Sequence, residues 1–296
     1  MGENVFDIEV GQLVIVDPRI HGSQQPDSKR DDILIGWAAL SADAVRTQKL
    51  WKDGSWAEYQ LVPASSLTII PNHKDSKYSA AQWGKLSYLS ISYGGLVRGN
   101  FQPGKIVIIT GATGDLGAGA VFIALAMGAS KVIAIGRNTQ QLAKLEELDK
   151  KRVIPLAYAE SSSDVTVEKL KSLTNGIGAD LVIDFVGGTS SVEPLLTCIR
   201  SLKYRDTAVF VGYINASIPI TYGEIMLNET EIRGCFMSPP DSFRQLILMV
   251  QCGLLDLTKV GTRTYSLDEI NQAIEDAAKK TGNHLIDWVI VQPTKL

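Results

Sequence analysis

The stretch from Ile106 to Arg137 constrains the fold of this chain more than any other part of it. Two apolar runs, Ile106–Thr110 and Lys131–Ile135, flank a segment that begins Gly-Ala-Thr-Gly-Asp-Leu-Gly. The spacing predicts a strand, a glycine turn, a helix over Ala118–Gly128 and a second strand, which together make a βαβ unit. Glycines let the backbone turn tightly, and the N–H groups at a helix start bind phosphate. The stretch therefore predicts a dinucleotide site; the alternative is a purely structural turn.

The residues after the second strand indicate which dinucleotide binds. Enzymes that use the unphosphorylated cofactor usually place Asp or Glu there, to accept hydrogen bonds from the ribose 2′-hydroxyl. This chain has Gly136, Arg137 and Asn138 instead. Arginine suits a 2′-phosphate through charge-assisted hydrogen bonds, whereas a carboxylate would repel it. We therefore expect NADP(H), the alternative being that Arg137 is a solvated loop cation.

Composition and charge exclude several classes of function. A chain of 296 residues, 45% of them apolar, can bury a substantial core. Its formal charge of −3 and its lack of a strong basic run argue against nucleic acid as a partner. No apolar run approaches the roughly 20 residues of a membrane span, and the first residues do not resemble a secretory signal. We expect no membrane contact and a cytoplasmic location, with the peroxisome as the alternative because Thr294-Lys295-Leu296 resembles its S-K-L signal.

The three cysteines and three histidines are dispersed along the chain, and no two cysteines form a C-x-x-C pair. Scattered cysteines are typical of reduced thiols in a reducing compartment. A structural zinc ion takes four ligands from Cys, His and acidic side chains at short spacings. The sequence therefore predicts no bound metal.

The segments before the βαβ unit read as a β-rich module followed by a helix. Strands are predicted over Val10–Pro18 and Gly54–Pro63, because each is an apolar run bounded by glycine and proline. A helix is predicted over Ala80–Leu96, where apolar residues recur at helical spacing.

After Arg137, helices and strands alternate. Strand, crossover helix and strand in succession indicate a parallel, doubly wound α/β sheet with helices on both faces. Near the end of the chain, Ser266 and Glu269 have the spacing of a capping box, and Leu285–Val291 is a final strand that can return to the β-rich module. The later strands of the sheet are predicted over Val153–Leu156, Leu181–Phe185, Ala208–Val211 and Ile232–Phe236.

Five stretches in order resemble the medium-chain dehydrogenase/reductase superfamily, and the resemblance covers nearly the entire chain. They are D-G-S-W-A-E-Y, S-Y-G-G-L, P-G-K-I-V-I-I-T-G-A-T-G-D-L-G, G-A-D-L-V-I-D-F-V-G and Y-S-L-D-E-I-N-Q-A-I. The G-A-T-G-x-x-G and G-R-N forms look more like the NADPH-using quinone and enoyl reductases and their fungal alcohol-dehydrogenase-like relatives than like zinc alcohol dehydrogenases. The resemblance implies a GroES-like substrate domain, residues 1–84 joined by 266–296, and a Rossmann domain, residues 85–265, with the active site between them.

The glycine pattern and the resemblance together imply which residues contact the cofactor. Tyr93 lies in the segment that is under the nicotinamide in the family and is the candidate proton donor, unless it only packs. Asp184, at the end of its strand, is expected to be a structural or cofactor-side polar group and not a base. The expected cofactor contacts are Gly111, Thr113, Gly114, Asp115, Leu116, Gly117, Gly136, Arg137, Asn138, Val186, Gly187, Gly212, Tyr213 and Phe236.

The chain also departs from the family. Members usually begin with about 60 further residues, which in zinc enzymes carry Cys and His metal ligands. The remaining zinc ligand lies where this chain reads Ser87-Tyr88-Leu89-Ser90-Ile91-Ser92, and Ser and Tyr are poor zinc ligands. We therefore expect a zinc-independent enzyme with a shortened substrate domain.

Two functions compete. One is an NADPH-dependent, zinc-independent oxidoreductase that transfers a hydride to a carbonyl or activated alkene of a small apolar molecule. The other is a catalytically weak or inactive NADP(H)-binding protein derived from a truncated dehydrogenase. In either case the apolar stretch Ile232–Met237 predicts a homodimer if it forms a sheet edge.

Overall fold

The computed structural model describes residues 2, 5–22, 31–158, 165–188, 191–279 and 287–293. The chain divides into two compact units. The first comprises Met1–Ser87, Leu257–Asn283 and Asp287–Leu296, and the described part of the second comprises Tyr88–Asp256. The second unit therefore ends before residue 265, where the sequence placed its end. The reason is that residues 261–266 form a strand that pairs within the first unit.

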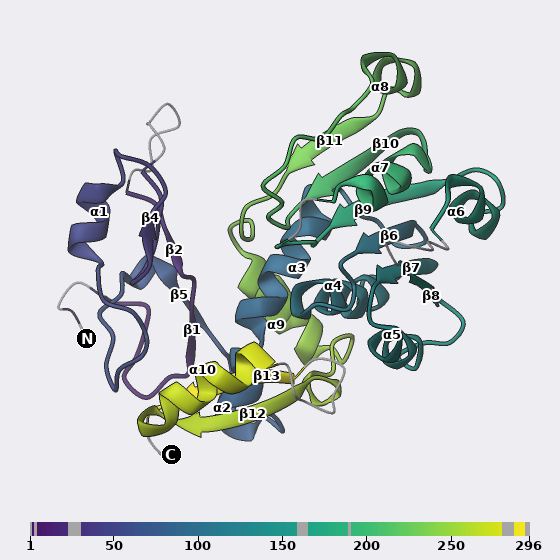
Figure 1. Ribbon diagram of the computed structural model, residues 1–296. Helices are drawn as coiled ribbons and strands as arrows, with labels where there is room; N and C mark the ends of the chain where they lie inside the picture. The colour runs from purple at the N-terminus through teal and green to yellow at the C-terminus, as the bar shows by residue number, and fades with distance from the viewer. Residues whose placement is uncertain are drawn as a thin grey trace. The chain divides into compact units, whose positions relative to one another are not determined.

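The second unit is built on six parallel strands in the order β11-β10-β9-β6-β7-β8 (Figure 1). From β6 the chain moves outward through β7 to β8, and from β9 it moves outward the other way through β10 to β11. The strand order therefore reverses between β6 and β9, which is where open α/β sheets bind ligands. The bounds are β6 Ile106–Thr110, β7 Lys131–Gly136, β8 Val153–Ala157, β9 Ala179–Asp184, β10 Leu202–Phe210 and β11 Glu231–Gly234.

Helices cover both faces of this sheet, which confirms the doubly wound α/β class. On one face, Ile108 and Val182 share a buried cluster with Leu170 of α6 and Leu195 of α7. Both faces are covered, so the central strands are apolar along their whole length, as parallel strands usually are. The bounds of the helices are α3 Leu86–Arg98, α4 Asp115–Ala126, α5 Thr139–Glu146, α6 Val167–Leu173, α7 Glu193–Arg200, α8 Tyr222–Asn228 and α9 Ser242–Gln251.

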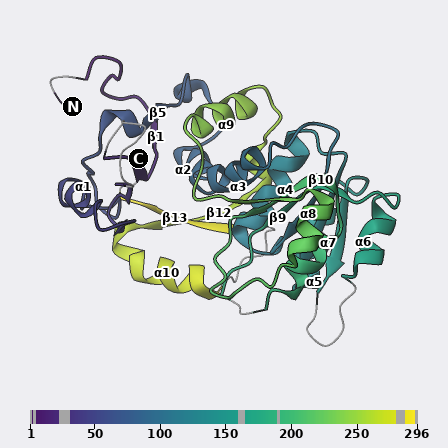
Figure 2. The same cartoon turned by 90° about the horizontal axis from the view of Figure 1, so that it is seen from above.

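Helices α3 and α4 lie side by side on the opposite face (Figures 1 and 2). A Cβ on Gly119 of α4 would lie 2.8 Å from the hydroxyl oxygen of Ser92 in α3. That hydroxyl donates a hydrogen bond of 2.7 Å to the carbonyl of Leu116. The contact fixes α3 against the first turn of α4.

The described residues of the first unit form three small sheets. Strand β1 pairs with β5, β2 with β3 and β3 with β4, all antiparallel, whereas β12 pairs with β13 in parallel. The strands are β1 Val14–Val16, β2 Arg19–Ile20, β3 Ile33–Leu34, β4 Ala38–Ala39, β5 Leu67–Ile69, β12 Gly261–Ser266 and β13 Asp287–Gln292. The helices are α1 Val45–Leu50, α2 Ala80–Gly84 and α10 Ile270–Lys279, with 3₁₀ turns at Ala64–Ser66, His73–Asp75, Leu257–Lys259 and Leu267–Glu269.

One prediction for this unit, the strand over Gly54–Pro63, is wrong. Residues 54–63 form no strand, because no described segment pairs with them, and Tyr59 is 90% exposed. The final strand β13 pairs with β12 and belongs to the same compact unit as residues 1–87, as the sequence predicted for a strand that returns to the β-rich module. The capping box at Ser266 and Glu269 is confirmed, and it begins the turn that leads into α10.

The predicted helix over residues 80–96 is broken into α2 and α3 at Lys85. The Lys85 side chain is buried, and its Nζ donates to the carbonyls of Leu257, at 2.9 Å, and Val260. Burial lowers the pKa of Lys85 to about 8, an effect that the nearby Asp287 carboxylate opposes. A buried ammonium group needs such hydrogen-bond acceptors. Leu257 and Val260, far along the chain from Lys85, supply them at the residue where the helix is interrupted.

Candidate cofactor site

The turn between β6 and α4 is held in place by its neighbours in the sheet. Gly111 has φ +67°, a conformation that L side chains rarely adopt. The N–H of Ala112 donates to the carbonyl of Ile135 in β7, at 2.9 Å, and the N–H of Gly114 donates to the carbonyl of Gly111, at 3.0 Å. The turn is therefore tight and anchored to the next strand.

The three glycines of this turn have different environments. A Cβ on Gly111 would lie 2.9 Å from the backbone of Phe185 and Val186, and one on Gly117 would collide with the carbonyl of Gly111. Gly114 has an ordinary φ of −86°, and its nearest neighbour would be 3.4 Å from a Cβ, which is a normal contact. The fold therefore requires glycine at positions 111 and 117, but not at 114.

Gly114 is also the N-cap of α4, and it has no side chain with which to cap the helix. The first N–H groups of a helix have no intrahelical acceptor, and the helix dipole places partial positive charge there. The N–H groups of Asp115, Leu116 and Gly117 are the ones at this end. An anionic group can bind here, and the missing side chain at position 114 leaves it room.

Further loops reach the same edge of the sheet, because the carboxyl ends of parallel strands lie together. Val186 and Gly187 follow β9, while Gly212 and Tyr213 follow β10. A Cβ on Gly212 would collide with the carbonyl of Val186, and one on Gly187 would lie 3.5 Å from the carbonyl of Tyr213. The structure therefore brings these predicted residues together, beside the switch point between β6 and β9.

The end of β7 borders the glycine turn directly. A Cβ on Gly136 would collide with the side chain of Thr113, so these two predicted residues are in contact. Arg137 is exposed and forms no hydrogen bond or ion pair with any described residue. Asn138 is the N-cap of α5, and its Oδ1 accepts a hydrogen bond of 3.1 Å from the N–H of Gln141. The amide NH₂ of Asn138 makes no such bond and can donate to a ligand.

Tyr93 lies on α3 next to Gly94, whose Cβ would be 2.5 Å from the carbonyl of Met237. Helix α3 therefore packs against the loop after β11, which also carries Phe236. Tyr93 is half-buried, and this burial raises its pKa, so the hydroxyl stays protonated at neutral pH. Within the described chain, the hydroxyl has no hydrogen-bond partner.

Tyr88, which is also on α3, was not among the residues predicted to line the site. Its side chain is 44% exposed, and burial together with the charge of Asp115 raises its pKa. Tyr88 therefore borders the start of α4. No motif indicates this, because the proximity depends on how α3 packs against α4.

A metal does not fit the residues that the structure describes. In the described ranges, no three His, Cys, Asp or Glu side chains are grouped as metal ligands would be. Ser90 and Ser92 are buried in α3, and the hydroxyl of Ser92 is committed to α4. In the same ranges, no helix is long and apolar enough to cross a membrane.

Comparisons with known proteins agree with this architecture. A family profile for zinc-binding dehydrogenase matches residues 116–251. The NAD-dependent alcohol dehydrogenase of Sulfurisphaera tokodaii is 26% identical over 279 residues, which are 93% of this chain and 74% of that one. The chain thus spans about three quarters of that relative.

Two solved structures share the fold. An alcohol dehydrogenase from Thermus sp. ATN1 has a TM-score of 0.77 at 23% identity, covering 98% of this chain and 80% of the other. A protein of Sinorhizobium meliloti, described as a zinc-binding dehydrogenase and bound to NADP, has a TM-score of 0.73 at 22% identity, covering 99% of this chain and 80% of the other.

Proposed function

The chain belongs to the medium-chain dehydrogenase/reductase superfamily of oxidoreductases, and on this premise we propose that it transfers a hydride between NADP(H) and a carbonyl or activated alkene of a small apolar molecule. The observation that carries the proposal is the glycine at position 114. The fold does not require it, since a Cβ there would make only an ordinary contact of 3.4 Å with the carbonyl of Gly111, and its lack of a side chain leaves the start of α4 accessible. In dinucleotide-binding turns, the second glycine lets the diphosphate approach the backbone. When bound, the nicotinamide supplies or accepts the hydride.

The choice of NADP(H) over NAD(H) rests on Arg137. Its guanidinium is exposed and unpaired within the described chain, directly after β7. A free guanidinium is suited to the 2′-phosphate, and no Asp or Glu stands at residues 136–138 to accept from a ribose 2′-hydroxyl. The Sulfurisphaera relative is named NAD-dependent and the Sinorhizobium protein binds NADP, so the relatives leave both cofactors open.

We also propose that Tyr93 donates the proton that accompanies hydride transfer, without a zinc ion. Its hydroxyl is protonated at neutral pH and has no competing partner in the described residues. Replacing Tyr93 by Phe removes only this hydroxyl. Loss of a general acid typically lowers kcat by about 10² to 10⁴-fold, and the Kd of the cofactor should stay unchanged.

Cofactor titration tests the proposal. The wild type should bind NADPH with one site per chain, and Gly114→Val should abolish binding while circular dichroism shows a folded protein. Gly223→Val is the matched control, because a Cβ at Gly223 in α8 would meet nothing within 4 Å. If Gly114→Val binds NADPH as the wild type does, the turn is only structural and the proposal is wrong.

A turnover assay separates the enzyme from the alternative, an NADP(H)-binding protein with little or no activity. NADPH consumption should be followed with a panel of aldehydes, ketones, quinones and enones, before and after prolonged chelation. Turnover that survives chelation supports the zinc-independent enzyme. Stoichiometric NADPH binding without consumption across the panel would favour the alternative.

A further inference from the structure

A buried polar pair occupies the point where the strand order of the sheet reverses. Thr110 is the last residue of β6 and Asp184 the last residue of β9, and the two are direct neighbours in the strand register. Their exposed fractions are 1% and 2%. The hydroxyl of Thr110 donates to Oδ1 of Asp184.

Asp184 also holds the two loops that follow β9 and β10. Its main-chain carbonyl accepts hydrogen bonds from the N–H groups of Val211, at 3.0 Å, and Gly212, at 2.8 Å. Its Oδ1 lies 3.4 Å from the N–H of Val186, which is a weak contact. The N–H of Phe185 in turn donates to the carbonyl of Thr110, at 3.2 Å. The side-chain pair therefore joins the ends of β6 and β9, and the main-chain carbonyl of Asp184 in turn holds the loop after β10.

The backbones of these loops lie so close together that only glycine fits at positions 111 and 212. The backbone of Phe185 and Val186 occupies the place of a Cβ on Gly111, and the backbone of Val186 occupies that of a Cβ on Gly212. A shift of a few tenths of an ångström in one loop must therefore move the others. These are the loops that carry Gly111, Val186 and Gly212, three of the expected cofactor contacts.

The carboxyl group acts here as a hydrogen-bond acceptor and not as half of an ion pair. No described lysine or arginine lies close enough to act on its charge, and burial raises the pKa of Asp184. Raising a folded-state pKa means that ionising the group in the folded protein costs free energy. A neutral acceptor of the same shape should therefore serve equally well.

We propose that Thr110 and Asp184 are positioning residues for the dinucleotide: their buried hydrogen bond fixes the ends of β6 and β9, and through the main chain of Asp184 the loop after β10, at the spacing that cofactor binding requires. This inference rests on the proposed function. It predicts that removing the hydrogen bond weakens cofactor affinity in protein that is still folded.

Isothermal titration with NADPH on paired variants tests the proposal. Thr110→Val removes the donor at constant shape, and Asp184→Ala removes the acceptor independently. Each should raise the Kd about tenfold or more, with one site per folded chain. Thr110→Ser and Asp184→Asn restore a donor and an acceptor, so both should bind within about threefold of the wild type.

Thr174→Val is the control for a merely structural loss. Thr174 is also buried, its hydroxyl is hydrogen-bonded to the carbonyls of Leu170 and Lys171, and it lies between α6 and the start of β9, at the opposite end of the strand. It should lower the melting temperature without changing the Kd. If Thr110→Val and Asp184→Ala bind with the wild-type Kd, the proposal is overturned while the proposed function stands. If the wild type binds neither NADPH nor NADH, both are overturned.

Discussion

At the level of single residues, the three glycines of the turn after β6 have different roles. They are Gly111, Gly114 and Gly117. Two of them are required because the backbone of another loop, or of the turn itself, occupies the place of a Cβ. Gly114 has room for a side chain and an ordinary φ, so the approach of a ligand is the better explanation for a glycine at this position. A similar division separates Arg137, which is free for a ligand, from Asn138, whose Oδ1 caps α5.

Arg137→Asp tests the cofactor choice at this scale. We expect NADPH to bind more than about tenfold more weakly, because a charge-assisted phosphate contact becomes a repulsion worth at least about 1.4 kcal/mol. NADH affinity should be unchanged or improved. Arg46→Asp, on the exposed surface of α1 in the first unit, makes the same change in net charge and should leave both affinities unchanged. A wild type that already prefers NADH would show that Arg137 is an ordinary surface cation.

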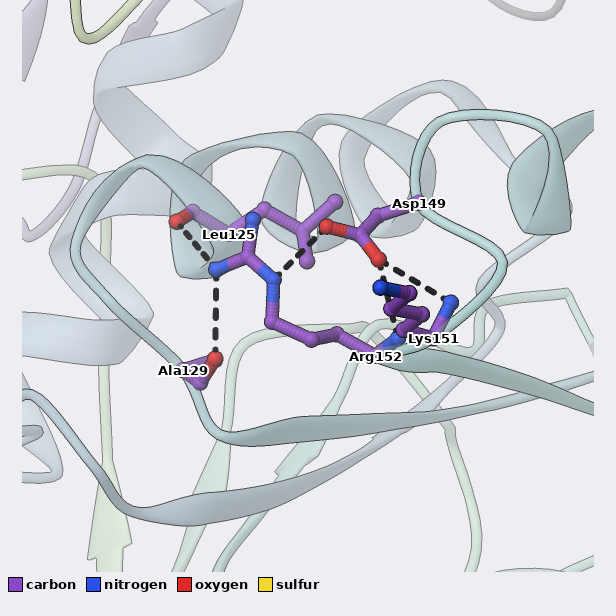
Figure 3. A network of polar contacts seen from close by, with 5 residues as sticks. All are labelled: Leu125, Ala129, Asp149, Lys151 and Arg152. Carbon is purple, nitrogen blue, oxygen red and sulfur yellow. Dashed lines mark hydrogen bonds and ion pairs between the residues drawn. The ribbon is translucent and has the colours of Figure 1, made fainter.

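Arg152 stabilises the C-terminal end of α4, which is opposite the end where the phosphate is proposed to bind. Arg152 donates from Nη1 to the carbonyls of Leu125, at 3.1 Å, and Ala129, at 3.3 Å, where the helix ends (Figure 3). Its Nε pairs with Oδ2 of Asp149 at 2.8 Å, and Oδ1 of Asp149 accepts from the N–H groups of Lys151 and Arg152, both at 3.0 Å. A cation here adds a second donor to the carbonyl of Leu125, which also accepts from the N–H of Gly128, and it complements the helix dipole.

Removing this cap should destabilise the element without affecting the ligand site. Arg152→Met should lower the free energy of unfolding by about 1 kcal/mol, measured by urea titration at pH 7, and leave the Kd of NADPH unchanged. Hydrogen bonding to Arg152 lowers the pKa of Asp149 from its ordinary 3.8. Its stabilisation is therefore fully present above about pH 4 and is lost as the pH falls through the lowered value.

Asp149→Asn provides the matched measurement of this pH dependence. The stability difference between wild type and Asp149→Asn should be constant near neutral pH and should shrink below about pH 4. A difference that persists unchanged at pH 2 would show that the ionised carboxylate contributes nothing.

At the scale of the whole molecule, the strand order leaves β11 at an outer edge of the six-stranded sheet. Ile232, in the middle of this strand, is 36% exposed, and Arg233 pairs with Glu231 on the same strand. An open edge with an apolar residue favours pairing with a second copy about a two-fold axis. We therefore keep the homodimer as a proposal.

Light scattering after size exclusion tests this proposal. The wild type should have twice the mass of one chain, and Ile232→Lys should be a monomer, because a charge on an open edge opposes pairing. Leu248→Lys, at a 49% exposed site on α9, controls for the loss of a surface apolar residue. A monomeric wild type, or an Ile232→Lys variant that remains dimeric, would contradict this interface.

Features that depend on short-range spacing could be predicted from the sequence. The βαβ unit, the alternation of strands and helices, and the capping box at Ser266 all follow from residues within a few turns of one another. Residues 54–63 have the composition of a strand, yet a strand forms only where a partner pairs with it, and no described segment does. The predicted helix over residues 80–96 is broken at Lys85, whose acceptors lie 172 and 175 residues further along the chain. Only the tertiary structure showed that Gly111 is packed against Phe185 and Val186 and that Thr110 meets Asp184, because both contacts join segments that are distant in sequence.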